Sequence, residues 1–404
     1  MDMVPIAFIC VCINKCVVNS HVGLEGRFYP PPALDRRQEL PENRAVDATE
    51  GIGQAVPAGR ARKEKRNEDM TLRIACLGAG YFSQFHIDGW QRIEEVSLVG
   101  VADRSLEKAE AFGAPAFDNI DALLATNPDI VDIILPPIGH AEAIRKALRQ
   151  SPQAIICQKP FCTSLQEARE ITQLAEDAGV SLVVHENFRF QPWYRKIKAA
   201  LQAGQIGTTL QASFRLRPGD GQGPDAYLAR QPYFQKMERF LIHETGVHWV
   251  DTFRYLFGEP SHVYADLRRV NPVIAGEDAG YVTFDHPGGV RALFDANRSL
   301  DHAADNTRRT MGEALIEGTD GTLTLYGDGS IWLRPFGTLE AEEIAPPDQH
   351  EGFGGDCTKA LQEHVVSALL NGSALENEAR DYLRVIEIEH AIYRSADEGR
   401  KLAV

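Results

Sequence analysis

Apolar residues follow two different rhythms along the chain, with a change near residue 190. Before it, short and fully apolar runs alternate with stretches in which apolar residues recur every three or four positions. This is typical of buried strands alternating with amphipathic helices, and it predicts a parallel sheet with helices on both faces. Beyond it, turn sequences such as Asp320-Gly321 and Asp328-Gly329 separate strand-like runs, which predicts hairpins in a mostly antiparallel sheet.

The pattern assigns each element to definite residues. In the first region it predicts strands over 71–78, 96–103, 130–135, 154–157 and 181–185, with helices from Ser83 onward and over 105–112, 119–126, 139–149 and 164–178. In the second region it predicts strands over 208–217, 263–270, 279–285, 290–296, 314–317, 322–326 and 330–334, and helices over 241–256, 356–370 and 377–395. The fold class is therefore α/β followed by α+β, with domains over 71–190 and 191–404.

Residues 1–70 differ from the rest of the chain. A mildly apolar stretch over 3–18 is interrupted by Asn14 and Lys15, no basic segment precedes it, and prolines and a charged run follow it. A secretory signal peptide is therefore disfavoured. We expect either a disordered leader or a biological start at Met70.

Composition and charge narrow the classes of protein that the chain can belong to. Of the 404 residues, 44% are hydrophobic and 25% are charged, which is typical of a globular protein with a sizeable core. The 57 acidic residues outnumber the 42 Lys and Arg, and the net charge of −15 disfavours nucleic acid as a partner. The chain has no run of about 18 apolar residues that would predict a membrane-spanning helix. Seven cysteines, an odd number, favour reduced thiols and a cytoplasmic location.

A glycine-rich turn follows the first predicted strand. Residues Gly78–Ser83 read GAGYFS, the GxGxxG pattern with serine in the third place. Gly78 permits a tight turn and Gly80 lets a pyrophosphate approach the backbone, while the next helix offers free N–H groups and its positive dipole end. We predict that Gly78, Gly80, Tyr81 and Phe82 bind a dinucleotide.

The residues after the second predicted strand bear on which dinucleotide binds. Asp103 lies 20 positions beyond Ser83 (103 − 83), the spacing at which a carboxylate binds the adenosine ribose of NAD. Arg104 follows it and could instead face the 2′-phosphate of NADP. NAD is slightly preferred over NADP as the predicted cofactor.

Lys159 is a candidate for proton transfer, because ligands of open α/β sheets bind beyond the carboxyl ends of the strands. It directly follows a buried strand, and Pro160 biases it to an extended conformation. A lysine in a partly apolar cleft has a readily lowered pKa, which suits general acid–base work. Taken alone, Lys159 could also be an ordinary surface lysine.

The predicted helix 241–256 carries three polar residues on one face. Glu244, His248 and Asp251 recur at i, i+4 and i+7. The stripe could serve acid–base chemistry, or it could be a solvated face. His243, Glu244 and His248 are also conceivable metal ligands, but no further ligand stands at a telling spacing, so we predict no metal site.

Several residues at or after the strand ends could line a substrate pocket or could simply be buried. These residues are His185, Asn187, Arg189, Trp193 and Tyr194.

Together, the motifs resemble one family in their order along the chain. In that order they are Gly78–Ser83, Asp103, Pro136-Pro137 with His140, Gln158-Lys159-Pro160, Asn187-Phe188-Arg189-Phe190, Gly246-Val247-His248-Trp249-Val250-Asp251 and Gly318-Thr319-Asp320-Gly321. The chain is similar to the glucose–fructose oxidoreductase / inositol dehydrogenase / MocA-like (Gfo/Idh/MocA) family over essentially all of 71–400. The motifs are short individually but specific in this order.

The resemblance implies a Rossmann domain followed by a domain with an open-faced sheet, often used for oligomerisation. It implies NAD- or NADP-dependent oxidation or reduction of sugars, polyols and their derivatives, in a homo-oligomer such as a dimer or tetramer. By position, Lys159 matches the lysine of the family's Glu-Lys-Pro motif and His248 the histidine of its Asp-x-Gly-x-His pattern. Pro136 and His140 then belong to the cofactor site. Glu244 stands where Asp is usual, which keeps the carboxylate but moves it by one methylene.

Two other functions stay open. The first is glycoside cleavage through transient oxidation, for which the family offers precedent and which retained cofactor without net NADH release would favour. The second is non-catalytic dinucleotide sensing, which the presence of both Lys159 and His248 disfavours. In the preferred mechanism, one of these two side chains moves the hydroxyl proton while a hydride passes between the substrate and nicotinamide.

Gln158 stands where the family has Glu, and this departure gives a first prediction. A carboxylate beside Lys159 favours the charged lysine, so its loss makes proton release easier. Gln158→Glu is therefore expected to shift the pH–rate profile of turnover to higher pH. A profile that is indifferent to this substitution would contradict the interpretation.

Overall fold

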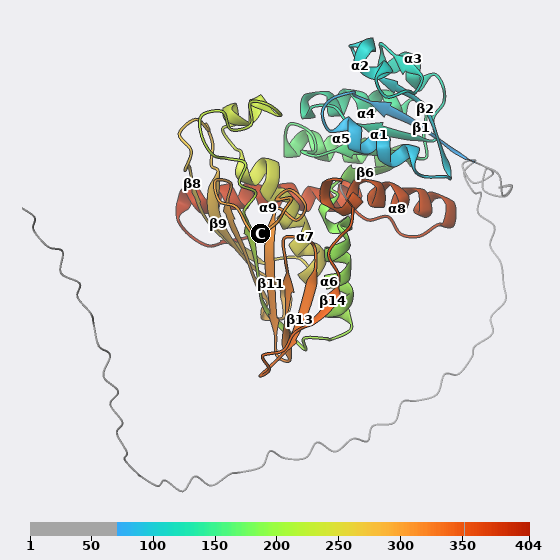
Figure 1. Cartoon of the computed structure of the whole chain (residues 1–404). Helices are drawn as coiled ribbons and strands as arrows, with labels where there is room; N and C mark the ends of the chain where they lie inside the picture. The colour runs from blue at the N-terminus through green and yellow to red at the C-terminus, as the bar shows by residue number, and fades with distance from the viewer. Residues whose placement is uncertain (1–70, 351) are drawn as a thin grey trace, which may run out of the picture. The chain divides into compact units, whose positions relative to one another are not determined.

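A computed structural model describes residues 71–350 and 352–404 (Figure 1). The predictions for residues 1–70 lie outside this range. In the described part of the chain, no helix is long and apolar enough to cross a membrane.

The first sheet is parallel throughout, as predicted, with strand order β3-β2-β1-β4-β5-β6. Its strands are β1 (Leu72–Leu77), β2 (Val96–Ala102), β3 (Ala116–Phe117), β4 (Ile130–Ile133), β5 (Ala154–Gln158) and β6 (Ser181–His185). Helices α1 (Ser83–Gln91), α2 (Leu106–Glu110), α3 (Ile120–Leu124), α4 (His140–Leu148) and α5 (Leu165–Asp177) alternate with them. The strand order reverses between β1 and β4, so the glycine turn after β1 lies at the point where such sheets bind their ligands.

The second sheet has nine strands in the order β14-β13-β12-β11-β7-β10-β9-β8-β15. All neighbours are antiparallel except β7 and β10, so the predicted antiparallel character is confirmed with one parallel pair. Its strands are β7 (Thr209–Leu216), β8 (His262–Arg268), β9 (Ala279–Asp285), β10 (Arg291–Asn297), β11 (Gly312–Gly318), β12 (Gly321–Leu325), β13 (Ile331–Pro335), β14 (Glu342–Ala345) and β15 (Leu402–Ala403). The sequence pattern missed β3 and β15, which have two residues each, and β14, which begins with two glutamates.

The longer helices of the second region are α6 (Pro192–Gln202), α7 (Val247–Phe257), α8 (Cys357–Asn371) and α9 (Ala379–Glu398). Short 3₁₀ segments are η1 (Pro137–Gly139), η2 (Phe188–Phe190), η3 (Pro232–Lys236), η5 (Pro287–Gly289) and η6 (Phe353–Asp356). The predicted helix 241–256 needs a correction, because its first six residues form a π-helix, η4 (Leu241–Gly246), before α7 begins. Six residues are too few for hydrophobic periodicity to distinguish a π-turn from an α-turn, and such turns are frequent at functional sites.

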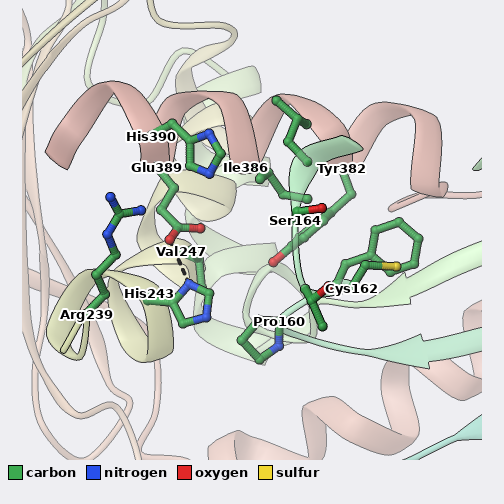
Figure 2. Close-up of a pocket in the computed structure, with 13 residues that line it drawn as sticks. Pro160, Cys162, Ser164, Arg239, His243, Val247, Tyr382, Ile386, Glu389 and His390 are labelled. Atoms are coloured by element: carbon green, nitrogen blue, oxygen red, sulfur yellow. Dashed lines mark hydrogen bonds and ion pairs between the residues drawn. The ribbon is translucent and has the colours of Figure 1, made fainter. Parts of the chain in front are cut away.

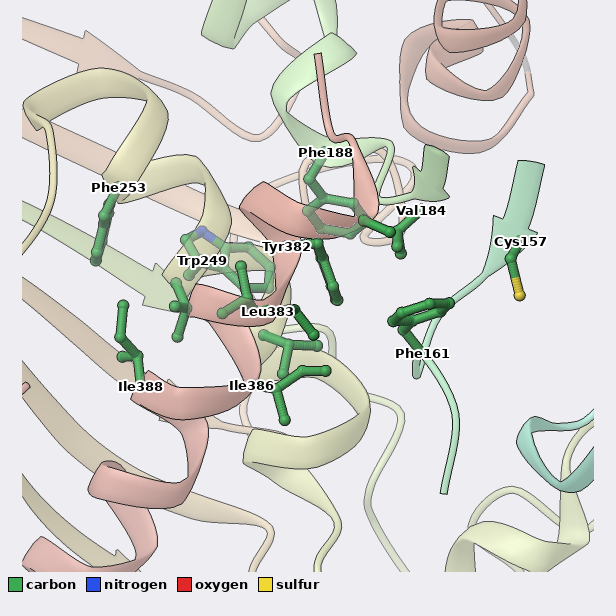
Figure 3. Close-up of a cluster of buried hydrophobic side chains, with 14 of the residues drawn as sticks. Cys157, Phe161, Val184, Phe188, Trp249, Phe253, Tyr382, Leu383, Ile386 and Ile388 are labelled. Carbon is green, nitrogen blue, oxygen red and sulfur yellow. The ribbon is translucent and has the colours of Figure 1, made fainter. Parts of the chain in front are cut away.

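One large apolar cluster joins α7 and α9 to the buried face of the second sheet (Figure 3). The Trp249 ring of α7 packs on Phe214 of β7 with ring centroids 4.4 Å apart and on Phe294 of β10 at 5.1 Å. Figure 3 shows Tyr382, Leu383 and other α9 side chains continuing this cluster toward Phe161 and Val184 of the first sheet region. The apolar core therefore runs from one sheet region into the other and holds α7 against the second sheet.

Helix α8 returns from near the C-terminus to the first sheet (Figure 1). Leu361 and Val365 belong to the same buried cluster as Ile74 of β1 and Trp90 of α1. The predicted division at residue 190 therefore assigns α8 to one domain while its side chains complete the core of the other. Early and late parts of the chain must come together before this core is complete.

This packing predicts that replacing two different leucines by alanine changes the free energy of unfolding by unequal amounts. The Leu361 side chain is 0% exposed in the α8 contact, and its replacement leaves a cavity, so Leu361→Ala should lower the free energy of unfolding by about 2–5 kcal/mol. Leu339→Ala removes a fully exposed side chain (101%) and should change it by less than about 0.5 kcal/mol. Denaturant unfolding of both variants measures this, and an equal effect at the two positions would refute the role assigned to α8.

Candidate active site

A cavity of about 610 Å³ opens beyond the carboxyl ends of the first sheet's strands. Its wall comes from the glycine turn, the ends of β4, β5 and β6, the π-helix η4, and loops of the second sheet. The residues from these elements that bear on the chemistry are Gly80, Lys159, Asn187, Glu244, His248, Arg298 and Arg308. The cavity thus brings together motifs that are far apart in the sequence.

Lys159 forms an ion pair with Glu244 in this cavity. Its Nζ donates to Oε1 of Glu244 at 3.0 Å and to the Glu244 backbone carbonyl at 2.5 Å. Burial opposes ionisation of the Glu244 carboxyl, but the positive charges of Lys159 and Arg298 outweigh it and hold its pKa well below the usual value. Glu244 therefore stays a carboxylate and fixes the lysine head at the wall of the cavity.

His248 is held by a carboxylate that the sequence motifs did not identify as its partner. Its Nδ1 lies 2.5 Å from Oε1 of Glu186, and its ring stacks on Phe188 with centroids 3.8 Å apart. Burial disfavours the charged form of Glu186, but His248 and Lys159 lower its pKa below the usual value. Because an ionised carboxylate only accepts hydrogen bonds, Nδ1 carries the hydrogen, and Nε2 of the neutral ring is the proton acceptor.

The predicted stripe of Glu244, His248 and Asp251 pairs along its length with residues from the first sheet's strand ends. Asp251 is fully buried and accepts hydrogen bonds from Nε of Arg189 at 2.8 Å and from its Nη2 at 2.5 Å. Burial raises the pKa of Asp251 to about 6, although Arg189 opposes this. The solvated-face alternative for the stripe is therefore wrong, because all three side chains have partners and Asp251 is inaccessible.

The glycine turn has the shape that a pyrophosphate needs. Gly78 has φ +113°, and a Cβ there would lie 2.5 Å from the carbonyl oxygen of Ile134. At Gly80 an added Cβ would meet nothing within 4 Å, so the space above the turn is open. Helix α1 starts without a side-chain cap, which leaves its N-terminal dipole available to an anion. These residues fit a dinucleotide.

Asp103 and Arg104 stand beside this turn. The Asp103 carboxylate accepts hydrogen bonds from the backbone N–H groups of Ala79 and Ser105, both at 2.9 Å. It is therefore held at the edge of the turn with lone pairs to spare for a ribose. Arg104 is exposed.

Of the other predicted cofactor residues, Pro136 lines the cavity and His140 does not. The His140 side chain is buried, and its Nε2 lies 2.7 Å from the carbonyl oxygen of Leu135. Burial lowers the pKa of His140 to about 4. Its contact is with the backbone that shapes the end of β4.

Among the predicted substrate residues, only Asn187 lines the cavity. His185 is buried with its ring 4.0 Å from that of His86, Arg189 is bound to Asp251, and Trp193 and Tyr194 pack in the core from α6. The geometry therefore does not support a substrate-binding role for these four. A position at a strand end was too weak a signal, since it does not say whether a side chain points into the crevice or into the core.

The loops of the second sheet supply polar groups that the motifs did not reveal. Arg298 is 2% exposed and donates to Asp220 at 2.9 Å, to the Tyr227 hydroxyl at 2.8 Å and to Thr245 Oγ1 at 2.5 Å. Arg230 also donates to Asp220, at 3.1 Å. None of these residues belongs to a recognisable motif, because their proximity depends on how the loops pack. Glu186 had a signal, its place at the end of β6.

His243 faces a second, smaller pocket of about 220 Å³ as well as the main cavity (Figure 2). Its Nδ1 lies 2.7 Å from Oε1 of Glu389, the pair joined by a dashed line in Figure 2. Within residues 71–350 and 352–404, no group of three or more metal-ligating side chains gathers. The geometry therefore gives His243 a carboxylate partner on α9.

Comparison with known proteins matches both regions to one family. Residues 72–186 match the model described as "Oxidoreductase family, NAD-binding Rossmann fold", and residues 194–324 match the "GFO/IDH/MocA C-terminal domain". The chain is 33% identical over 339 residues to a D-apiose dehydrogenase of Paraburkholderia graminis, covering 81% of this chain and 88% of the relative. It is 28% identical to a D-apiose dehydrogenase of Rhizobium rhizogenes, covering 82% and 97%.

A solved structure extends the match to the whole described fold. It is an oxidoreductase from Agrobacterium radiobacter in complex with NAD⁺, L-tartaric acid and magnesium. The TM-score is 0.74 at 27% identity, and the match covers 82% of this chain and 98% of that one. With its glycine turn, its open sheet and the order of its motifs, the chain belongs to the GFO/IDH/MocA family of oxidoreductases.

Proposed function

We propose that this protein is an NAD(P)-dependent dehydrogenase or reductase that acts on a CH–OH group of a sugar, a polyol or a related derivative. One observation carries the proposal: Lys159 and His248 line the same cavity as the glycine turn, and each is held by its own carboxylate. The D-apiose dehydrogenases among the relatives support a sugar-type substrate.

The chain's own residues supply the proton chemistry. The neutral Nε2 of His248 accepts the substrate hydroxyl proton, and Glu186 stabilises the imidazolium that forms. Nζ of Lys159 donates a hydrogen bond to the same substrate oxygen, which stabilises the negative charge that develops there. Bound nicotinamide would accept or supply the hydride. Burial lowers the pKa of His248 against the opposing effect of Glu186, so the ring is neutral and ready to accept a proton near neutral pH.

The remaining polar residues of the cavity suit a substrate with several hydroxyls. Glu244 and Asp220 present acceptors and Arg230 presents donors at the same wall. Most of these charges are paired with each other, so a polyhydroxylated ligand can exchange hydrogen bonds with them without leaving a buried charge unpaired. We propose NAD as the preferred cofactor because the Asp103 carboxylate is held at the edge of the turn. Homo-oligomerisation and a cytoplasmic location stay predictions.

Lys159→Ala tests the catalytic assignment. Turnover should fall by about 10²–10⁴-fold, because the substrate oxygen loses its charged donor, while the dissociation constant for NADH should stay within about threefold of wild type. The assay follows reduced-cofactor absorbance with a panel of sugars, polyols and their acids, with NAD and with NADP, and NADH titration measures binding. Retained turnover in the variant would remove Lys159 from the mechanism.

Glu186→Gln tests the His248 pair through pH dependence. The Glu186 carboxylate favours the protonated ring, so its removal lowers the pKa of His248 further. The neutral ring is the base, so the fall of kcat/KM on the acid side of its pH profile (the acid limb) should move to lower pH. Its plateau should fall about tenfold or more, because the base is weaker and less well oriented.

Glu389→Gln is the matched control for this experiment, because Glu389 pairs with His243 at the smaller pocket. We expect it to leave the acid limb in place. A limb that moves to higher pH in Glu186→Gln, or a plateau equal to that of the wild type, would contradict the assignment of His248 as the base.

A further inference from the structure

The cationic side chains that line the main cavity differ in whether a carboxylate forms an ion pair with them. Lys159 is paired with Glu244, and Arg230 and Arg298 share Asp220. Arg308 lines the same cavity, but among the described residues no carboxylate lies within ion-pair distance of it. Its guanidinium is therefore the cavity cation with charge left over for a ligand.

Arg308 comes from the loop between β10 and β11 and reaches the glycine turn. Its Nη1 donates a hydrogen bond to the Tyr81 hydroxyl at 3.2 Å, although the two residues are 227 positions apart. The guanidinium carbon lies 5.8 Å from the ring centroid of Phe353, which also contacts Phe82. These contacts hold the charged head of a second-sheet loop against the turn that follows β1.

The position that Arg308 faces is already suited to an anion. Gly80 leaves open space above the turn, and α1, which has nine residues, begins there without a side-chain cap. A guanidinium forms paired hydrogen bonds with phosphate oxygens, and such charge-assisted bonds are stronger than neutral ones. The chain as a whole carries a net charge of −15, which repels an anionic dinucleotide. A local positive charge at this turn therefore strengthens dinucleotide binding.

Resting on the proposed function, we propose that Arg308 is a clamp for the cofactor's pyrophosphate, supplied by the second sheet across the mouth of the cavity. The glycine turn and the start of α1 bind the pyrophosphate from one side, and Arg308 closes on it from the other. Tyr81 holds the guanidinium near this position before the dinucleotide binds. The clamp makes dinucleotide affinity depend on a loop outside the Rossmann region.

The test compares dinucleotide binding by the full-length protein and three variants. Arg308→Ala should raise the dissociation constant for NADH by about 10- to 100-fold, and Arg308→Lys should raise it less because the charge remains. Arg309→Gln is the matched control: Arg309 is the next residue of the same loop, but it is paired with Asp348 at 3.0 Å and does not line the cavity. It should leave the dissociation constant within about threefold of wild type. Titration calorimetry with NADH, and separately with ADP and adenosine, gives the readout, and a melting curve of each variant confirms folding.

A pyrophosphate contact predicts that Arg308→Ala weakens NADH and ADP but leaves adenosine unchanged, and that raising the salt concentration narrows the gap between variant and wild type. Equal NADH affinity in Arg308→Ala and wild type would overturn the clamp and leave the proposed function intact. An unchanged NADH affinity with a raised KM for the sugar would overturn it in favour of a substrate contact. A wild-type protein that binds neither NADH nor NADPH would overturn both the clamp and the proposed function.

Discussion

The site depends on three acid–base pairs that join one helical stripe to the strand ends of the first sheet. Glu244 binds Lys159, His248 binds Glu186, and Asp251 binds Arg189. In the last pair Asp251 is fully buried and Arg189 nearly so. Removing one partner of such a buried pair costs about 3–5 kcal/mol, because the other charge loses its main partner. This pair therefore fixes the rotation of α7, and with it the direction of His248 one turn earlier. The two pairs nearer the cavity then hold the groups that we assign to proton transfer.

The same stripe explains how the two regions of the chain form one candidate site. Trp249 packs helix α7 against the second sheet. His248 and Asp251 of the same helix pair with residues that follow the last strand of the first sheet. Helix α8 completes the core under α1, so the late part of the chain supports the nucleotide turn as well. A cavity that lies between these elements keeps its geometry only while both cores are packed.

Local periodicity was enough to predict most of the fold. The strands β1, β2 and β4–β6 and the helices between them repeat a pattern whose physical cause, burial on one face or both, lies within each segment. Lys159, Glu244 and His248 could be predicted because short motifs carry them. Arg298 and Arg308 contact residues that are distant in the sequence, which no local pattern encodes, and Glu186 was marked only by its place directly after β6. For the same reason, the strand-end position of Trp193 and Tyr194 did not reveal that both side chains, which lie on α6, are buried in the core.

In the function that we propose, Lys159 and His248 converge on the reactive face of a nicotinamide bound at the glycine turn. The most direct measurement is a crystal structure of the protein with NADH and a bound polyol. We expect the pyrophosphate over Gly80, and Nζ of Lys159 and Nε2 of His248 both within hydrogen-bond distance of one substrate oxygen next to nicotinamide C4. A complex in which either group points away from that oxygen, or in which the dinucleotide binds elsewhere, would contradict it.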